Sequence, residues 1–304
     1  MKQIYTTLGP RRREEVGMIL PHEHVFVDLR TPDQPGYAEA EIDAVVASMV
    51  PQIEAIKRQG ITLLVECTTG GIGRRADIDL AVSKAADFPI VVPTGNYREP
   101  WIPAWIAEAR EDDLEQWMVG ELTEGIEETG VLAGWIKLSA GDGGISPLEA
   151  RILRAAARAS VRTNAVIGSH TIRGRVAMEQ LDILLSEGCS PERFISIHTQ
   201  AEKDFGLHRE LVDRGAWIEY DHVGRAPDAE LVSMIMRAVD TGLGEHLLIS
   251  HDLGWYDPAR PGGGTPRPYT HLVDSLLPSL KTSGVSEDAI CQLTEVNPFE
   301  AFAR

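Results

Sequence analysis

The chain has 304 residues, a length at which two domains or one large α/β barrel are the leading expectations. Hydrophobic residues make up 43% and charged residues 25% of the composition, which is ordinary for a globular protein and excludes wholesale disorder. Acidic residues (46) outnumber basic residues (29), and the net charge of −17 argues against nucleic acid and membrane surfaces as partners.

Short apolar runs that end in polar or charged residues recur along the whole chain. They are rich in Val, Ile or Leu and bounded by Gly, Pro or polar residues, as is typical of buried parallel strands. The eight runs span residues 18–24, 61–68, 88–95, 134–140, 165–171, 194–200, 216–222 and 246–252. We expect each of them to form a strand.

Helical patterns lie between these runs. Residues 39–59 carry apolar side chains at three- and four-residue spacings, which predicts an amphipathic helix, and Pro51 within it predicts a kink or a new helix start. Residues 147–162 follow a Ser-Pro pair that favours a helix N-terminus. Residues 176–187 and 229–240 show the same helical pattern.

Eight strand–helix units of roughly thirty residues predict a (β/α)8 TIM barrel, an α/β fold. We expect a single domain over residues 1–304, in which 258–268, rich in Gly and Pro, is the most flexible-looking stretch. A doubly wound open sheet is the alternative. It is less favoured because no GxGxxG follows the first strand and polar residues end nearly every strand.

Metal-binding side chains stand at the ends of several predicted strands. The active site of such a barrel lies at the C-terminal ends of the strands, so these side chains should converge. They are His22, His24, Lys137, His170, His198 and Asp252. Two histidines at i and i+2 on a strand point to the same side, so their imidazoles can share one cation. Four imidazoles and a carboxylate are the ligand set expected for Zn²⁺ or a similar transition metal.

A single histidine at a strand end is more often a core or surface residue than a metal ligand. The metal prediction therefore depends on four of the nine histidines occupying one layer of the barrel together. His208, His246 and His271 fall on helices, loops or strand starts, and we expect no metal role for them.

Lys137 has two possible roles. Burial beside cations would depress the pKa of its amine, and a neutral amine can react with CO₂ to form a carbamate that bridges two metals as a carboxylate does. The alternative is an ordinary ion pair between Lys137 and Asp252 or Asp221.

Several segments carry a family resemblance. They are PHEH (21–24), IKLSAGDGGISPLEARILRAAARA (136–159), GSHT (168–171), IHT (197–199), ISHD (249–252) and the tail PYTHLVDSLLPSL…GVSEDAI…NPFEAFA. Together, and in this order, they resemble the phosphotriesterase family of the amidohydrolase superfamily over essentially the whole chain.

The resemblance implies two divalent metal ions. One would be bound by His22, His24 and Asp252, and the other by His170 and His198, with a carboxylated Lys137 and a hydroxide bridging the two. Zinc is the leading expectation, although Mn, Co and Fe accept the same ligands. Family habit also implies a homodimer.

The chemistry expected of this centre is hydrolysis of a small ester or lactone. Two cations sharing a water lower the pKa of that water and deliver hydroxide, and Asp252 can pass the proton of the nucleophile to the leaving group. The alternatives are hydrolysis of an N-acyl amide, hydrolysis of a phosphotriester, and a non-catalytic metal-binding barrel.

Two further residues are candidate catalytic groups. Tyr97 resembles the tyrosine by which lactonases of the family contact the substrate carbonyl or the hydroxide. His222 stands where those lactonases commonly carry Arg, whereas phosphotriesterase and its homologues carry His there, and this departure from the lactonase pattern argues against a quorum lactone as the substrate. The family often has Asp shortly after the histidine of the sixth strand, but here Thr199 and Gln200 follow His198, so a carboxylate relay to His222 is not expected.

Loop residues after the predicted strands are candidates for substrate binding, chiefly Tyr97, Arg225 and Trp255. Aromatic side chains there could line an apolar cleft, or equally a subunit interface or loop core; they are Trp101, Trp105, Trp255 and Tyr256. Arg98, Arg173 and Arg225 could bind a carboxylate or phosphate, or be solvated. The net charge therefore does not exclude an anionic substrate.

The cysteines and the N-terminal segment bear on location. Cys67, Cys189 and Cys291 are widely spaced and form no disulfide framework, which fits a reducing compartment. Neither a signal peptide nor an apolar run of membrane-spanning length is apparent. We expect a cytoplasmic protein that acts on a small molecule.

Overall fold

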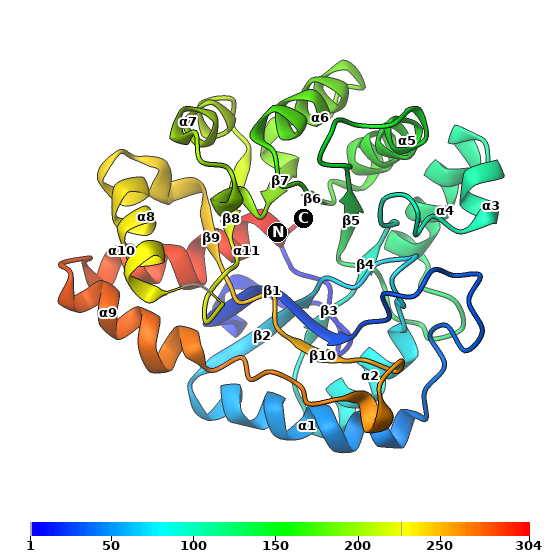
Figure 1. The fold of residues 1–304 in the computed structure, drawn as a ribbon, viewed down its shortest axis with the longest axis horizontal. Helices are drawn as coiled ribbons and strands as arrows, with labels where there is room; N and C mark the ends of the chain where they lie inside the picture. Colours follow the sequence, from blue (N-terminus) through cyan, green and yellow to red (C-terminus); the bar gives the residue numbers. More distant parts are fainter. Residues whose placement is uncertain (1, 226) are drawn as a thin grey trace.

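Parallel strands form a ring inside a layer of helices in the computed structural model, which describes residues 2–225 and 227–304 (Figure 1). The strands are β1 Met18–Phe26, β2 Ile61–Glu66, β3 Ile90–Val91, β4 Pro93–Thr94, β5 Trp135–Ser139, β6 Ile167–His170, β7 Phe194–Ile197, β8 Trp217–Tyr220, β9 Leu247–Ile249 and β10 Gly254–Tyr256. Every predicted run contains a strand, and β10 is an additional one.

The ladder of the ring is divided into two sheets, with strand orders β10-β1-β2-β3 and β4-β5-β6-β7-β8-β9. One break falls at Val92, which separates β3 from β4 within the predicted third strand. At the other, between β9 and β1, His22 N donates to Ser250 Oγ (3.1 Å) and Asp252 N donates to the His22 carbonyl (3.0 Å). The strand order is that of the predicted barrel, although the ladder is not closed in the described residues.

The helices lie outside the strands (Figure 1). They are α1 Ile42–Arg58, α2 Ala76–Ala86, α3 Ala104–Glu108, α4 Glu111–Thr123, α5 Pro147–Thr163, α6 Gly174–Ser186, α7 Phe205–Asp213, α8 Asp228–Asp240, α9 Leu277–Thr282, α10 Glu287–Cys291 and α11 Asn297–Phe302. Short 3-10 turns include η3 Thr199–Ala201 and η5 Pro261–Gly263, and π-helical turns span Leu272–Leu276 and Gln292–Val296. Among the described residues no helix is both long and apolar enough to cross a bilayer.

The four predicted helices are confirmed as α1, α5, α6 and α8. The expected new helix start at Pro51 is wrong, because α1 continues through it. Pro51 is on the exposed side, whereas Val45, Met49 and Ile53 are buried. Packing of this buried face outweighs the hydrogen bond lost at the proline.

Apolar side chains fill the N-terminal end of the ring. A buried cluster from the strands and both chain termini includes Ile4, Leu63 and Trp135, and the Trp135 ring packs edge-on against Phe302 with centroids 5.2 Å apart. The termini are joined there by backbone hydrogen bonds between Gln3 and Arg304. The buried polar groups of the predicted site stand at the opposite end of the strands.

Candidate active site

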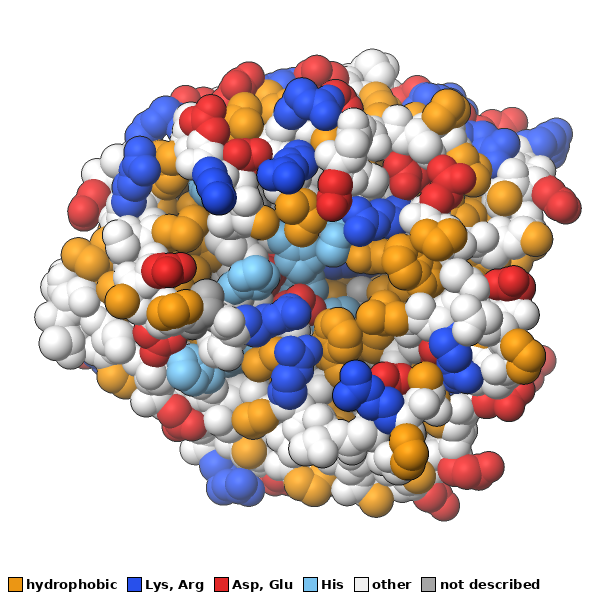
Figure 2. Space-filling view, viewed as in Figure 1, with side chains coloured by type: hydrophobic (Ala, Val, Ile, Leu, Met, Phe, Trp, Pro, Cys, Tyr) orange, Lys and Arg blue, Asp and Glu red, His pale blue; other side chains and the backbone are white. Residues whose placement is uncertain are grey.

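The structure brings together the six side chains that were predicted to bind metal, which we name the candidate metal cluster. They line a cavity of about 180 Å³ at the C-terminal ends of the strands and come from β1, β5, β6, the turn after β7 and the turn after β9. Figure 2 shows histidine side chains at the bottom of a hollow in this face of the molecule. Tyr97, Arg225 and Trp255, predicted to contact substrate, line the same cavity.

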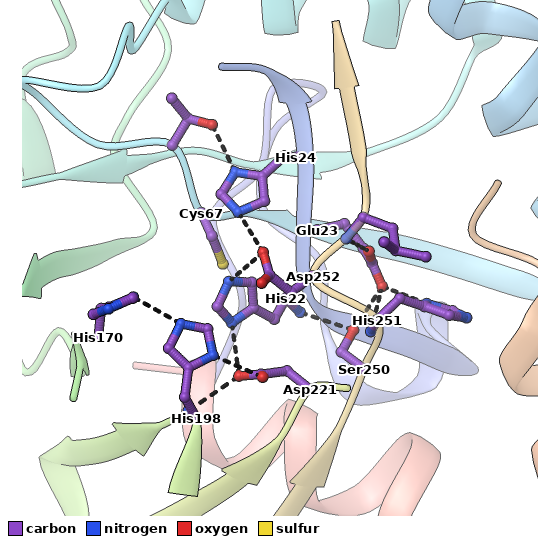
Figure 3. A network of polar contacts seen from close by, with 12 residues as sticks. His22, Glu23, His24, Cys67, His170, His198, Asp221, Ser250, His251 and Asp252 are labelled. Carbon is purple, nitrogen blue, oxygen red and sulfur yellow. Dashed lines mark hydrogen bonds and ion pairs between the residues drawn. The ribbon is translucent and has the colours of Figure 1, made fainter. Parts of the chain in front are cut away.

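The donor atoms of the cluster form two groups. In the first, Asp252 Oδ1 lies 3.0 Å from His24 Nε2 and 3.6 Å from His22 Nε2. In the second, His198 Nε2 lies 2.8 Å from His170 Nδ1. Figure 3 shows the two groups side by side, with the ring of His22 between Asp252 and His198. Each group has the nitrogen and oxygen donors that a transition metal ion accepts.

Three of the imidazoles are held by a hydrogen bond on their second ring nitrogen. His22 Nδ1 lies 3.1 Å from Glu219 Oε2. His24 Nδ1 lies 2.8 Å from Thr68 Oγ1, and His198 Nδ1 lies 2.7 Å from Asp221 Oδ1. Such partners fix the orientation of a ligating histidine and its tautomer. In all three residues Nε2 is left facing the other donors of the cluster.

His170 is oriented the other way. Its Nδ1 faces His198 and also lies 3.1 Å from the Tyr97 hydroxyl, whereas its Nε2 is buried without a hydrogen-bond partner among the described residues. His170 therefore presents Nδ1, and not Nε2, to the other donor atoms of the candidate metal cluster. The unpaired Nε2 is an unfavourable feature of a purely structural histidine.

Lys137 is buried on β5, with 2% of its surface exposed. In the parts of the chain that the structure describes, its Nζ makes neither an ion pair nor a hydrogen bond, and it lies 5.6 Å from the centre of the Trp135 ring. The alternative of an ion pair with Asp252 or Asp221 thus finds no support. A buried ammonium without an anionic partner is unfavourable, so this environment fits a modified lysine that serves as a ligand.

Burial sets the protonation of the cluster. Burial, reinforced by the positive charge of Lys137, lowers the pKa of His22 to about 3. Burial and the proximity of His198 hold the pKa of His170 well below its usual value. Burial opposes ionisation of Asp252, but the hydrogen bond to His24 and the nearby imidazoles lower its pKa. At His24 the carboxylates of Asp252 and Glu66 outweigh burial and raise the pKa. The lowered pKa values of His22 and His170 favour their neutral forms, which are the forms that bind metal.

Two buried carboxylates on and after β8 support the cluster, and the sequence reasoning did not assign them this role. Asp221 accepts hydrogen bonds at Oδ1 from Gln200 Nε2 (2.7 Å) and at Oδ2 from His198 N (3.1 Å), in addition to its contact with the His198 ring. Burial and the charge of Asp221 raise the pKa of Glu219 well above its usual value. The signal for both was their spacing of two residues, which places them on the same side of a strand.

A second network fixes the turn that carries Asp252. Glu23 Oε1 accepts hydrogen bonds from Ser250 Oγ (2.8 Å) and from His251 N and Nδ1 (3.0 and 2.6 Å), and Oε2 accepts one from Leu253 N (3.0 Å). The His251 ring accepts a hydrogen bond at Nε2 from Leu272 N (2.9 Å), so the proton of this ring resides on Nδ1. The network ties the end of β9 to β1 (Figure 3).

The residues predicted to contact substrate occupy the wall of the cavity. Burial raises the pKa of Tyr97 to about 12, so its hydroxyl stays protonated. Arg225 forms an ion pair with the Asp252 carboxylate and also donates to its carbonyl (3.2 Å). The Trp255 ring packs edge-on against His24, with centroids 5.5 Å apart. His222 is half-buried after β8, is not among the residues that line the cavity, and has its pKa lowered by burial.

The other loop candidates lie outside the cavity lining. Arg98 forms an ion pair with Asp142 (2.6 Å), and Arg173 is exposed at the start of α6. Trp101 donates to the Leu29 carbonyl (2.9 Å), and Trp105 is half-exposed and packs on Trp117.

Tyr256 is buried and stacks on Phe26. The three histidines for which no metal role was expected also lie elsewhere: His208 contacts the Tyr220 hydroxyl (2.7 Å), His246 packs against Trp217, and His271 contacts Asp228 (2.8 Å).

Comparison with known proteins places the chain among hydrolases. The model of the phosphotriesterase family matches residues 2–302. A phosphotriesterase homology protein from Mycobacterium tuberculosis is 30% identical over 100% of this chain and 98% of its own length. A phospho-furanose lactonase from Mycoplasmopsis synoviae is 28% identical over 98% of this chain and 91% of its own length.

A solved structure supports the same assignment. A mutant of a PTE-like lactonase from Deinococcus radiodurans superposes with a TM-score of 0.89 at 31% identity, covering 98% of this chain and 99% of that one. The predicted α/β barrel is confirmed by this similarity and by the parallel strand order. The matches extend over nearly the whole chain, and they show that this protein belongs to the phosphotriesterase family and is a hydrolase, as the motifs around His22, Lys137 and Asp252 predicted.

Proposed function

We propose that the protein is a two-metal hydrolase that opens a lactone or cleaves a small ester. The observation that carries this proposal is the candidate metal cluster itself, whose donors line one cavity with three imidazoles held by hydrogen bonds from behind. A non-catalytic barrel would have no use for a buried, unpaired Lys137 in that position.

The donors divide between two cations. His22, His24 and Asp252 would hold one, and their donor atoms already lie within 4.8 Å of one another. His170 and His198 would hold the other, with Lys137, as a carbamate, shared by both. When bound, the two cations would lower the pKa of a shared water and polarise the carbonyl of the substrate.

The protein's own side chains then act on the substrate and its protons. Asp252, whose lowered pKa keeps it ionised, would accept the proton of the nucleophile and deliver it to the leaving oxygen. Tyr97, which remains protonated, can donate a hydrogen bond to an oxygen that gains negative charge. Arg225 would orient the Asp252 carboxylate from the solvent side.

Two relatives favour a lactone as the substrate. The central cavity, of about 180 Å³, is lined by Tyr97, Trp255 and Ile72 beside the polar cluster. The similar proteins include two lactonases, but also an aryldialkylphosphatase from Saccharolobus solfataricus and an N-acetyltaurine hydrolase from Dictyostelium discoideum. Amide and phosphotriester hydrolysis would use the same groups and are the competing outcomes of the test.

The test is turnover of a substrate panel by protein reconstituted with Zn²⁺ or Mn²⁺ and assayed for metal content. The panel contains γ- and δ-lactones, aryl esters, N-acyl amines and paraoxon. We expect lactones or esters to give the highest kcat/KM. A higher kcat/KM for amides or paraoxon would overturn the substrate assignment, and two bound metals with no turnover of any compound would favour a non-catalytic barrel.

A further inference from the structure

A second hollow adjoins the central cavity, and arginines line it. Its volume is about 370 Å³, and it shares Val27, Leu29, Arg225 and Trp255 with the central cavity. We name it the arginine pocket; its remaining lining side chains include Asp257, Arg260 and Arg267. Figure 2 shows Lys and Arg side chains at the rim of the hollow that holds the histidines.

The charges of the arginine pocket are not balanced. Arg225 is paired with Asp252, and Arg260 is paired with Asp257 at 3.1 Å. The half-buried Arg267 makes no ion pair and no side-chain hydrogen bond among the described residues. Burial lowers the pKa of Arg267, and the positive charge of Arg225 lowers it further, which shows that positive charges are close together here. Because arginine stays protonated in proteins, one guanidinium charge remains available to a ligand.

Arg267 is held at a fixed place beside the central cavity. Its guanidinium carbon lies 5.0 Å from the centre of the Trp255 ring, whose other neighbour is His24 of the cluster. A guanidinium stacked on an aromatic ring keeps its N–H groups free at its edge for bidentate binding of an oxyanion.

The loop that carries Arg260 and Arg267, residues 257–268, packs against β1 and β10, and we call it the strap. Arg267 N donates to the Gly254 carbonyl, and Asp257 N donates to the Gly263 carbonyl, both at 2.9 Å. Gly254 has φ +95°, and a Cβ there would lie 2.0 Å from the His24 carbonyl oxygen. The strap is therefore seated directly on β1, the strand that supplies two donors of the cluster.

We propose that the arginine pocket binds an anionic group of the substrate, a phosphate ester or a carboxylate, at a distance from the bond that is cleaved. The substrate class is then a lactone or small ester that carries such a group. This inference rests on the proposed hydrolase function and narrows it. The net charge of −17 does not exclude such a ligand, because Arg267 in the pocket has no ion-pair partner among the described residues.

The kinetic test uses metal-loaded protein and three lactones with the same ring: one with a hydroxymethyl, one with a phosphorylated hydroxymethyl and one with a carboxymethyl substituent. We expect kcat/KM for one of the anionic lactones to exceed that for the neutral lactone by about tenfold or more, mainly through KM. The anionic lactone with the higher kcat/KM identifies whether the pocket prefers a phosphate or a carboxylate. Arg267→Gln should lower kcat/KM for the anionic lactone about tenfold more than it lowers kcat/KM for the neutral lactone, and Arg267→Lys should keep part of the preference for the anion.

A control variant distinguishes the effect of losing Arg267 from the effect of changing the net charge of the protein. Arg209→Gln changes the charge equally but lies on α7, where the Arg209 guanidinium makes only 3.5 Å contacts with the Thr241 carbonyl. It should leave both kinetic constants unchanged. Asp257→Asn keeps the shape of the loop and removes the competing anion, so it should increase the preference severalfold.

An equilibrium measurement gives a readout that does not depend on turnover. Titration calorimetry of metal-loaded protein with inorganic phosphate should show at least tenfold weaker phosphate binding in Arg267→Gln than in Arg209→Gln, because the metal centre, which also accepts phosphate, is common to both variants. If neither the lactones nor the aryl esters of the panel are hydrolysed, the proposed function fails, and calorimetry still tests the pocket. If the neutral and anionic lactones are hydrolysed equally and Arg267→Gln binds phosphate as the unmodified protein does, the inference is overturned and the proposed function stands.

Discussion

The candidate metal cluster and the arginine pocket share a wall but are built in different ways. Side chains of the cluster come from several strands and are braced by carboxylates and hydroxyls behind them, such as Glu219, Asp221 and Thr68. The arginine pocket takes its charged groups chiefly from one loop after β10, held by backbone hydrogen bonds, and its charges are not fully paired. The difference supports a division in which the strands supply the catalytic groups and the loop after β10 selects the substrate.

The strongest test of this division is Lys137→Ala. If the strand-borne cluster carries the chemistry, loss of the bridging ligand should reduce the metal content from two cations to one and reduce turnover by more than any change in the arginine pocket. Metal analysis and kcat on the best lactone measure both effects. Partial rescue by added short carboxylic acids would support the carbamate role, and full metal content with unchanged turnover would contradict it.

Asp252→Asn tests the proton-transfer role within the cluster. The amide keeps a ligand oxygen but cannot accept a proton, so we expect kcat to fall by about 10²–10⁴-fold with metal content retained. Stopped assays with metal analysis on the same sample measure this. Near-normal turnover would show that another group carries the proton.

Gly254→Ala tests whether the strap and the strand are mechanically joined. An alanine Cβ would meet the His24 carbonyl at 2.0 Å and would require φ +95°, so we expect a loss of about 3 kcal/mol or more in the free energy of unfolding. Gly262→Ala in the same loop is the matched control, because Gly262 has φ +61° and open space around it, and should cost about 1 kcal/mol. If urea unfolding shows that the two variants lose the same free energy of unfolding, close packing of the loop against β1 does not contribute to stability.

Asp221→Asn weakens the bracing of the cluster without touching a proposed ligand atom. The amide accepts a weaker hydrogen bond from the His198 ring, so metal affinity should fall by about 10–100-fold. Competition with a chelator measures it. Phosphate binding in the arginine pocket should be unchanged, and a parallel loss there would show that the two regions are not independent.

The smallest effect concerns pH and the loop after β1. Asp28 accepts hydrogen bonds from Arg30 N and Nε (2.9 and 3.0 Å) and from Ala38 N (2.8 Å). Although burial opposes it, these bonds lower the pKa of Asp28 below 3.8. As the pH falls, the Asp28 carboxyl is therefore protonated in the unfolded chain before it is protonated in the folded protein. Ionised Asp28 stabilises the folded protein above about pH 4, and this stabilisation is lost as the pH falls through the lower pKa of the folded state.

Asp28→Asn should consequently lower the free energy of unfolding by about 1–2 kcal/mol at pH 7 and by less at pH 2. Urea unfolding of both proteins at the two pH values measures the difference. If the loss in the free energy of unfolding does not change with pH, packing of the loop, and not the charge of Asp28, is responsible for it.

Much of this architecture was predictable because it depends on local pattern. Runs of β-branched residues located the strands, and the polar residue at the end of each run located the site, since parallel strands present the same edge to one face. The split at Val92 and the continuation of α1 through Pro51 were not predictable, because each depends on packing against neighbouring elements.

The supporting residues were harder to predict than the candidate ligands. Glu219 lies within a strand and resembles an ordinary buried residue until the position of His22 is known. Arg260 and Arg267 belong to a Gly- and Pro-rich stretch that looked flexible, and only its hydrogen bonds to Gly254 and within the loop define a pocket. The homodimer and the cytoplasmic location remain predictions.

The backbone pairing of Gln3 with Arg304 has a practical consequence. It places both ends of the described chain beside the buried apolar cluster that contains Trp135 and Phe302, at the end of the barrel opposite the candidate active site. A tag, a surface linker or a second protein attached at either end would leave the mouth of the barrel open to substrate. The same proximity makes the two ends suitable for joining by a short peptide, with new ends opened in an exposed loop.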